Sequence, residues 1–385
     1  MALPINRRNW LKASTLLTGG LAFAPAIWNR LQASPVKQKN NINSDAEFLA
    51  DIPPVLKARL SANENPFGPS DKAKLAITAA LGSSYQYGFM GNRTLAQKIA
   101  AKENFDSKMV MLGAGSTPIL HATAIHYSKD GGNIVTGDPS YADLPAHAEL
   151  LHSKWVKVPL TADYKLDLDA MEKAVTADTK LVCICNPNNP TGTSLETSKL
   201  KAFCERVSKK VPVFVDEAYI DYLPDPQGSS MLPLVKAGNN IIVARTFSKL
   251  YGFAGLRIGY AIAPTSILDM LELYNSDAAL SSLSVGAAIA AYDDQEYLRS
   301  AHEKTMVSKE FLYSVLKAEG YEYIPTSANF VMFPIKMDGK RFSEEMFKRG
   351  VSIRNWKFNN KDWCRVSIGR MDEMQAFADA FKQIS

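Results

Sequence analysis

The feature that most constrains the fold of this chain is a series of short apolar runs separated by longer amphipathic stretches. The runs are MVMLGAG, NIVTGD, KLVCICN, VPVFVDEAY, NIIVART and GLRIGYAIA, between positions 109 and 263. Short runs rich in β-branched side chains and bounded by turn residues are typical of buried strands. Amphipathic stretches between such runs are typical of the helices that connect parallel strands. We therefore expect an α/β domain with a largely parallel central sheet.

The C-terminal part of the chain has a different pattern. Helical periodicity dominates from about residue 282 through HEKTMVSKEFLYSVLKAEG, and shorter strand-like runs follow at ANFVMFPI and WCRVSIG. This pattern predicts a smaller α+β domain over residues 282–385. The large domain is expected over 81–281, preceded by an N-terminal arm over 51–80.

The N-terminus reads as a targeting segment. Two arginines, Arg7 and Arg8, precede an apolar run from Leu16 to Ala26 that is too short and too glycine-rich to span a membrane. Residues 1–33 resemble a cleavable twin-arginine export signal, followed by a polar linker over 34–50. This resemblance implies the twin-arginine translocase as a partner and a periplasmic location; a basic tail without targeting meaning is the alternative.

Charge and side-chain spacing exclude some classes of function. The formal charge of +5 includes Arg7, Arg8 and Lys12 of the signal, and without these three side chains the charge is 5 − 3 = +2. That balance gives no indication of nucleic-acid binding. The histidines and cysteines lack the spacings of metal sites, so no metal is expected.

Three polar residues follow strand-like runs at a place where they can meet. Asn189, Asp216 and Lys249 each stand at or just beyond the C-terminal end of such a run, and ligands of open α/β sheets bind outside those ends. Lys249 lies among apolar and glycine residues in TFSKLYGFAGLRIGY. It is either a lysine that extends its amine to solvent or a desolvated amine able to form a Schiff base with an aldehyde. Asp216, at the end of an apolar strand, needs a cationic partner.

The stretch MVMLGAGSTPIL predicts a phosphate site. A dinucleotide-binding glycine pattern would need glycine where Pro118 stands, so the nicotinamide hypothesis fails. Ser116, Thr117 and Pro118 instead form a good helix start. The free amides of a helix N-terminus bind phosphate.

Eight short motifs occur in an order that resembles a known family. They are ANENPFGPS, GSTP, PSY, NPNNPTG, DEAY, TFSKLYGFAGLRIG, SANF and CRVSIG. The order is that of fold-type I pyridoxal-phosphate aminotransferases of class I and II. Within them the motifs are most similar to the histidinol-phosphate aminotransferases, and the resemblance runs from about Ala58 to the C-terminus.

The resemblance implies a role for each residue around the pyridoxal-phosphate cofactor. Lys249 would form the Schiff base and move the proton as base and acid. Asp216 would keep the ring nitrogen protonated, and Asn189 and Tyr219 would hydrogen-bond the ring oxygen. Tyr141 would stack on the ring. The phosphate would be held by Ser116, Thr117, Thr246, Ser248 and Arg257.

The resemblance also implies a homodimer and a substrate class. Tyr87 matches a tyrosine that reaches the cofactor phosphate of the neighbouring subunit, so the two active sites would be shared. Arg354 and Arg365 match arginines that bind the anionic end of the substrate, and Asn63 matches a substrate-binding position. The expected partners are therefore an amino donor and a 2-oxo acid such as 2-oxoglutarate.

Two departures from the family pattern leave the substrate open. GSTP lacks the acidic residue that relatives commonly carry after the serine, and FMG replaces their usual Pro-Asp pattern after Tyr87. The leading hypothesis is an aminotransferase acting on an amino acid or amino phosphate. The alternatives are a decarboxylase of the threonine-phosphate type and a cofactor-binding protein without turnover.

Overall fold

The computed structural model describes residues 56–385, within a compact unit that runs from Pro54 to Ser385. The predicted signal over 1–33, the linker over 34–50 and the first residues of the predicted arm lie outside the described residues.

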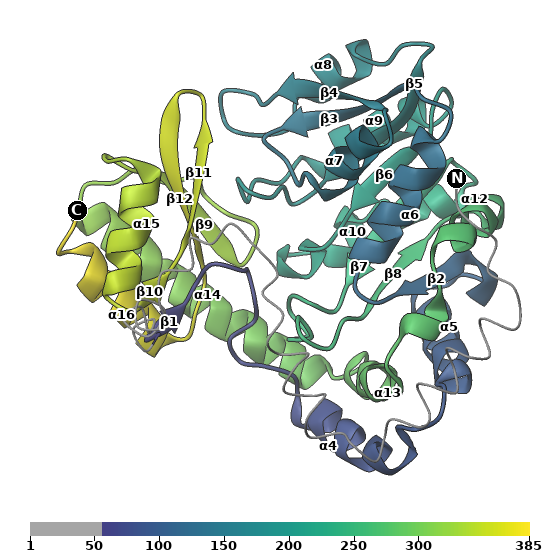
Figure 1. Ribbon diagram of the computed structural model, residues 1–385, viewed down its shortest axis with the longest axis horizontal. Coiled ribbons are helices and arrows are strands. Elements are labelled where there is room, and N and C mark those ends of the chain that lie inside the picture. The colour runs from purple at the N-terminus through teal and green to yellow at the C-terminus, as the bar shows by residue number, and fades with distance from the viewer. Residues whose placement is uncertain (1–55) are drawn as a thin grey trace, which may run out of the picture. The chain divides into compact units, whose positions relative to one another are not determined.

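A seven-stranded sheet forms the centre of the larger part of the molecule (Figure 1). Its spatial order is β2-β8-β7-β6-β5-β3-β4. All strands run parallel except β8, which is antiparallel to both of its neighbours. The strands are β2 (Val110–Gly113), β3 (Asn133–Asp138), β4 (Lys154–Pro159), β5 (Thr179–Cys185), β6 (Val213–Asp216), β7 (Ile241–Thr246) and β8 (Gly259–Ile262). The expected α/β fold with a mostly parallel sheet is confirmed.

Alternate side chains of the strands enter two separate apolar cores, one on each face of the sheet. In β6, for example, Val213 and Val215 pack on one face and Phe214 on the other, because successive strand residues point to opposite sides. The core beside Phe214 is completed by α6 (Thr117–Ser128), α7 (Asp143–Leu150) and α12 (Thr265–Leu271). The opposite core is completed by α5 (Phe89–Glu103), α8 (Leu168–Lys173), α9 (Thr197–Val207), α11 (Leu232–Lys236) and α13 (Ser282–Ala291).

The smaller part is an antiparallel three-stranded sheet with its own core, as the C-terminal pattern predicted (Figure 1). The sheet has the order β11-β12-β9 and a two-stranded sheet pairs β1 with β10. Its elements are β1 (Ala58–Arg59), α14 (Gln295–Ala318), β9 (Phe330–Pro334), α15 (Gly339–Lys348), β10 (Val351–Ser352), β11 (Arg354–Phe358), β12 (Lys361–Ser367) and α16 (Met371–Phe381).

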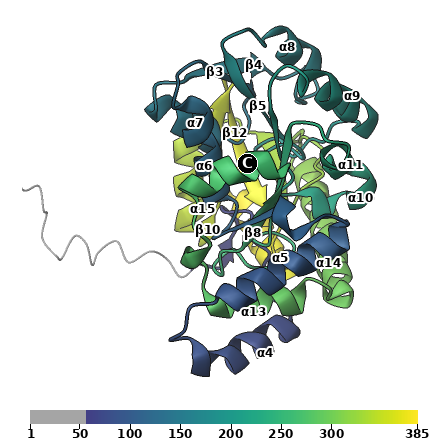
Figure 2. The same ribbon diagram turned by 90° about the vertical axis from the view of Figure 1, so that its right-hand side faces the viewer.

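The core of the large sheet and the core of the small part divide the chain differently from the predicted boundary at 282. The helix α13 packs against α5 and against α4 (Asp71–Ala80), and Figure 2 shows these helices side by side. Val285 and Leu298 belong to the core of the large sheet, whereas Ala58 and Leu60 from the start of the described chain belong to the core of the small part. The small part therefore takes in a segment from each end of the described chain.

Strand direction brings distant segments to one edge of the large sheet. The strands β2, β3, β5, β6 and β7 end at this edge, and β8 begins there because it runs in the opposite direction. Within residues 56–385 no helix is long and apolar enough to cross a membrane. In the same part of the chain no group of three His, Cys, Asp or Glu side chains is placed to hold a metal ion.

Candidate active site

A pocket of about 280 Å³ lies at the edge of the sheet where these strands end. It collects every predicted site residue except Tyr87. The predicted residues that line it are Asn63, Ser116, Thr117, Tyr141, Asn189, Asp216, Tyr219, Thr246, Ser248, Lys249, Arg257, Arg354 and Arg365. Tyr87 is 79% exposed on the surface beside α5, where its ring stacks on Phe89.

Lys249 is placed in the pocket by the loop that follows β7. Its Nζ donates a hydrogen bond to the Asn63 carbonyl at 3.3 Å and lies 5.3 Å from the ring centre of Tyr219. Burial, with the nearby positive charge of Arg365, lowers the pKa of Lys249 to about 8, although Asp216 opposes the shift. An amine with this pKa is unprotonated often enough near neutral pH to act as a nucleophile and a base.

Asp216 is the last residue of β6 and is 3% exposed. Its Oδ1 accepts a hydrogen bond from the Ala218 backbone N–H at 3.0 Å, and it has no ion-pair partner within 4 Å among residues 56–385. Burial raises the pKa of Asp216 to about 6. A cationic ring N–H in the pocket would supply the missing partner.

Hydroxyls and one guanidinium form a cup at the start of α6. The Thr246 hydroxyl donates to Ser248 Oγ at 3.0 Å, and Arg257 Nη1 donates to the same Ser248 Oγ at 3.2 Å. Ser116 stands at the N-cap of α6, where the first helical amides are free. Since Arg257 also has no carboxylate partner in the described chain, this cup suits a phosphate group.

Two glycines let the backbone form this cup. Gly115 has a φ of +82°, and a Cβ there would overlap the Arg257 guanidinium. A Cβ on Gly259 would lie 2.6 Å from the Ser116 backbone nitrogen. Glycine is therefore required at 115 by the left-handed backbone and at 259 by the close approach of β8 to the start of α6.

Arg365 is the second cationic centre of the pocket. It is 3% exposed, and it donates from Nη1 to Asn189 Oδ1 at 2.6 Å and from Nη2 to the Ser61 carbonyl at 3.0 Å. Its Nε has no hydrogen-bond partner and no carboxylate pairs with it within residues 56–385. Burial lowers the pKa of Arg365 to about 10. Arg354 lies directly opposite Arg365 in the β11–β12 register.

Comparison with known proteins agrees with this geometry. Residues 56–381 match the model of the family described as aminotransferase class I and II. The chain belongs to the class I and II aminotransferase family. It is 35% identical to histidinol-phosphate aminotransferase 1 of Idiomarina loihiensis over 327 residues. The matched region covers 85% of this chain and 89% of that relative.

Solved structures give the same assignment. The histidinol-phosphate aminotransferase of Sinorhizobium meliloti, in complex with pyridoxal-5'-phosphate, matches with a TM-score of 0.77 and 28% identity, covering 86% of this chain and 92% of that one. The L-threonine-O-3-phosphate decarboxylase of Porphyromonas gingivalis has a TM-score of 0.74 at 19% identity, over 85% of this chain and 98% of that one, which shows a common fold alone. The chain is therefore a pyridoxal-phosphate-dependent aminotransferase similar to the histidinol-phosphate aminotransferases.

The residues of this aminotransferase fit its cofactor. Lys249 offers a partly desolvated amine, Asp216 a buried carboxylate without a cation, and Arg257 with its hydroxyl neighbours a phosphate cup. The fit is independent of the family match, because each group lacks within the described chain the partner that the cofactor would supply.

Some residues of the site were not predicted from the sequence. Ser367 and Asn329 both hydrogen-bond Asn63, and Ser61 accepts a hydrogen bond from Arg365. Ser367 and Asn329 stand inside the motifs CRVSIG and SANF, so the signal was present without a role attached to it. Asn63, predicted as a substrate-binding residue, lines the pocket, and its side-chain amide is hydrogen-bonded to Tyr219 and Ser367.

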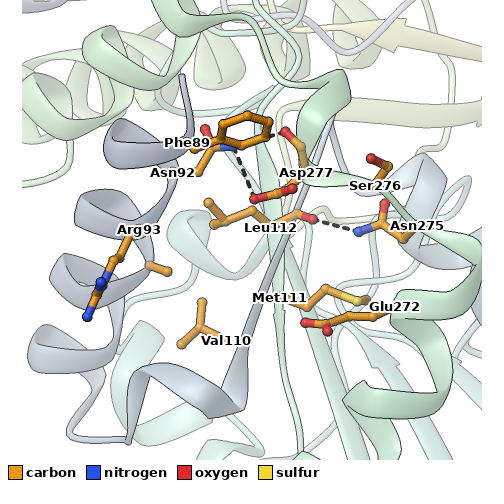
Figure 3. Close-up of a pocket in the computed structure, with 11 residues that line it drawn as sticks. Phe89, Asn92, Arg93, Val110, Met111, Leu112, Glu272, Asn275, Ser276 and Asp277 are labelled. Carbon is orange, nitrogen blue, oxygen red and sulfur yellow. Dashed lines mark hydrogen bonds between the residues drawn. The ribbon is translucent and has the colours of Figure 1, made fainter. Parts of the chain in front are cut away.

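A larger pocket, of about 380 Å³, lies between α5 and the segment after α12 (Figure 3). No lysine lines it. Its amides bond neighbouring groups of the protein: Asn92 donates to Asp277, and Asn275 donates to the Leu112 carbonyl. It therefore lacks the reactive groups of the pocket at Lys249.

Proposed function

We propose that this aminotransferase moves an amino group from a small amino compound with an anionic end to a 2-oxo acid such as 2-oxoglutarate. The observation that carries the proposal is the buried guanidinium of Arg365, whose Nε is unpaired in the described chain. A buried cation without a counter-ion is costly, and the anionic end of a substrate would supply one. Arg354, across from it, gives the same end a second contact.

The relatives narrow the donor to a short set of candidates. The Idiomarina relative is named a histidinol-phosphate aminotransferase, so histidinol phosphate is the first donor to test. Its phosphate would bind at Arg365 and Arg354, separate from the cup at Arg257 that suits the cofactor phosphate. An amino acid would place its carboxylate on the same two arginines.

The chemistry follows from the groups in the pocket. Bound pyridoxal phosphate supplies an aldehyde that condenses with amines and a ring that withdraws electrons from the substrate α-carbon. Lys249 removes the α-proton and returns it, as an amine of pKa about 8 can do near neutral pH. Asp216 would hold a proton on the ring nitrogen, and the Tyr219 hydroxyl would donate a hydrogen bond to the ring oxygen; both residues line the pocket.

A donor panel tests this proposal. Purified protein with pyridoxal phosphate and 2-oxoglutarate is offered histidinol phosphate, unphosphorylated histidinol and common amino acids, and glutamate formation is measured. We expect an anionic donor to be used and histidinol to be poor. Release of carbon dioxide from a phosphorylated amino acid without 2-oxoglutarate would instead support the decarboxylase alternative.

The exposed aromatic surface around Tyr87 supports a homodimer with shared active sites. Tyr87 is joined on α4, α5 and the turn between them by other exposed apolar side chains, namely Leu75, Leu81, Tyr85, Phe89 and Met90. Such a patch is typical of a subunit interface. Mixing Tyr87→Ala with Lys249→Ala subunits should restore part of the activity that each variant lacks alone, because a mixed dimer would contain one intact site.

Export is the last part of the proposal. Arg7 and Arg8 and the apolar run after them support passage of the folded protein through the twin-arginine translocase into the periplasm. Its donor would then be a periplasmic compound with an anionic end, away from cytoplasmic histidine biosynthesis. In cell fractions, we expect processed wild type in the periplasm and unprocessed Arg7→Lys/Arg8→Lys in the cytoplasm. Full-length wild type in the cytoplasm would contradict export and leave histidinol phosphate as the leading donor.

A further inference from the structure

Asn63 makes hydrogen bonds through both its backbone and its side chain beside the reactive amine. It is 2% exposed, and its backbone has a φ of 54°, in the left-handed region. Its carbonyl faces Lys249, its side-chain amide faces Tyr219, and both its backbone N–H and its Oδ1 face Ser367. We propose that Asn63, clamped by Ser367, is a positioning residue that holds the amine of Lys249 and the hydroxyl of Tyr219 for the aminotransferase reaction.

Ser367 fixes both the backbone and the side chain of Asn63. The Asn63 N–H donates to Ser367 Oγ at 2.7 Å, and the Ser367 hydroxyl donates to Asn63 Oδ1 at 3.0 Å. A left-handed backbone is unfavourable for a residue other than glycine, although asparagine adopts it more readily than most. The clamp, with Ser367 itself 2% exposed on β12, keeps Asn63 in this conformation.

The clamp decides the direction of the Tyr219 hydroxyl. Asn63 Nδ2 donates to Tyr219 OH at 3.0 Å, and Asn189 Nδ2 donates to it at 3.5 Å. A hydroxyl has two acceptor positions and one proton. With both acceptor positions used, the proton of Tyr219 is left to donate into the pocket, where a ring oxygen would accept it.

The same clamp controls the surroundings of Lys249. The Asn63 carbonyl accepts from Lys249 Nζ at 3.3 Å and from Asn329 Nδ2 at 3.1 Å. A carbonyl that accepts from an ammonium group favours the charged form and so raises the pKa of the amine. The hydrogen bond from Lys249 Nζ to the Asn63 carbonyl would therefore act against the effect of burial. The charged groups that act on Lys249 are Arg365 and Arg257, which lower its pKa, and Asp216 and Glu64, which raise it.

The strand that binds the substrate anion also carries the clamp. Ser367 lies two residues after Arg365 on β12, so both side chains project from the same face of the strand. Arg365 reaches Tyr219 through Asn189, and Ser367 reaches it through Asn63. A serine that does not line the pocket thus supports the two groups that would handle the proton.

The test measures Lys249 in the cofactor-free protein, so it does not depend on turnover. The rate of labelling by an amine-reactive reagent is followed against pH, with the label on Lys249 quantified by peptide mass mapping. Wild type should give a midpoint near pH 8, in line with a pKa of about 8 for Lys249. Ser367→Ala should lower that midpoint by roughly half a unit to one unit, the size expected for one misaligned hydrogen bond.

Two Asn63 variants separate the effect of Asn63 on Lys249 from its effect on Tyr219. Asn63→Gly keeps the carbonyl and tolerates the left-handed backbone, so the labelling midpoint should stay near the wild-type value while turnover falls with the loss of the Tyr219 contact. Asn63→Ala disfavours the left-handed backbone, so the midpoint should fall as in Ser367→Ala. Ser327→Ala, which removes a hydrogen bond to Ser194 and no contact to Asn63, is the matched control and should leave the midpoint unchanged.

An unchanged Lys249 midpoint in a folded Ser367→Ala protein would overturn the proposal. If Ser367→Ala does not fold, the comparison of Asn63→Ala with Asn63→Gly decides, and equal midpoints in these two would overturn it. The role proposed for Asn63 and Ser367 rests on the proposed aminotransferase function. The labelling of Lys249 that tests it does not require that activity. A wild type that labels with a midpoint near pH 8 and uses no donor in the panel would contradict the proposed function alone.

Discussion

Replacing Asp216 by asparagine should make the cofactor-free protein more stable, although it should impair the enzyme. Asp216 is buried at the end of β6 without a cationic partner, and burial raises its pKa from 3.8 to about 6. Because the folded state binds the proton more tightly than the unfolded state, the free energy of unfolding falls as pH rises from 3.8 through 6 and is constant above that. The difference of about 2 pKa units corresponds to about 3 kcal/mol at 1.36 kcal/mol per unit.

The gain in the free energy of unfolding from Asp216→Asn should increase with pH. Asp216→Asn removes the charge and keeps an oxygen to accept from the Ala218 N–H. We expect a gain of about 3 kcal/mol above pH 7, about half of that near pH 5, and about 0.5 kcal/mol near pH 4. The assay is urea unfolding of both cofactor-free proteins across this range. A variant no more stable than wild type at pH 8, or a gain that does not grow with pH, would refute the reasoning.

Glu217, the next residue, provides a control for which the expected change in the free energy of unfolding has the opposite sign. Glu217 is also buried, but it accepts from Arg245 Nε at 2.9 Å and from the Met231 N–H at 2.7 Å. Glu217→Gln should therefore destabilise the protein by about 3–5 kcal/mol, the usual cost of breaking a buried ion pair. Saturating pyridoxal phosphate should reverse the order for Asp216→Asn, because the bound ring cation favours the carboxylate and cofactor binding stabilises wild type more.

Three further predictions concern single groups of the site. Lys249→Ala should lower turnover by several orders of magnitude, and borohydride reduction of the wild-type holoenzyme should place the cofactor on Lys249 by peptide mapping; a label on another lysine would contradict the assignment. Gly115→Ala should weaken cofactor affinity at least tenfold in a fluorescence titration, since a Cβ there overlaps Arg257; unchanged affinity would exclude this cup as the phosphate site. Arg365→Lys should lower kcat/KM for an anionic donor by roughly 100-fold while the cofactor affinity stays near wild type, because an ammonium cannot repeat a bidentate contact; an equal loss with an uncharged donor would argue against anion binding.

Most strands of the large sheet could be predicted from the local sequence pattern, and the strands that were not predicted differ from them in burial. The six apolar runs became strands because each is buried on both faces of the sheet. Two strands were not predicted from the sequence: β4 (Lys154–Pro159), an edge strand whose side chains are mostly exposed or half-buried, and β11 (Arg354–Phe358), an edge strand whose side chains are also largely exposed. These two edge strands bury little apolar surface, so their sequences lack the continuous apolar run on which the prediction rested. The other edge strand of the large sheet, β2, is fully buried and has such a run.

The candidate site could be predicted only as a set of residues. The eight motifs contain every predicted residue that lines the pocket except Arg354. Residues at the carboxyl ends of parallel strands converge at one edge of the sheet. The contacts among these residues were not predictable. Asn63 and Ser367 are 304 positions apart, and no local pattern relates them.

The sequence by itself therefore determined the fold class, the strands of the sheet centre and the chemical groups that meet at its edge, since burial periodicity and turn residues act over short distances along the chain. Tertiary structure decided which of these groups are paired and which are left without a partner. Asp216 and Arg365 are available to pair with a bound ligand because they are buried without counter-ions in the described chain. Glu217 and Arg245, in contrast, form an ion pair with each other. Desolvation and pairing depend on neighbours brought in from the whole chain, so only the folded molecule fixes the protonation of its active site.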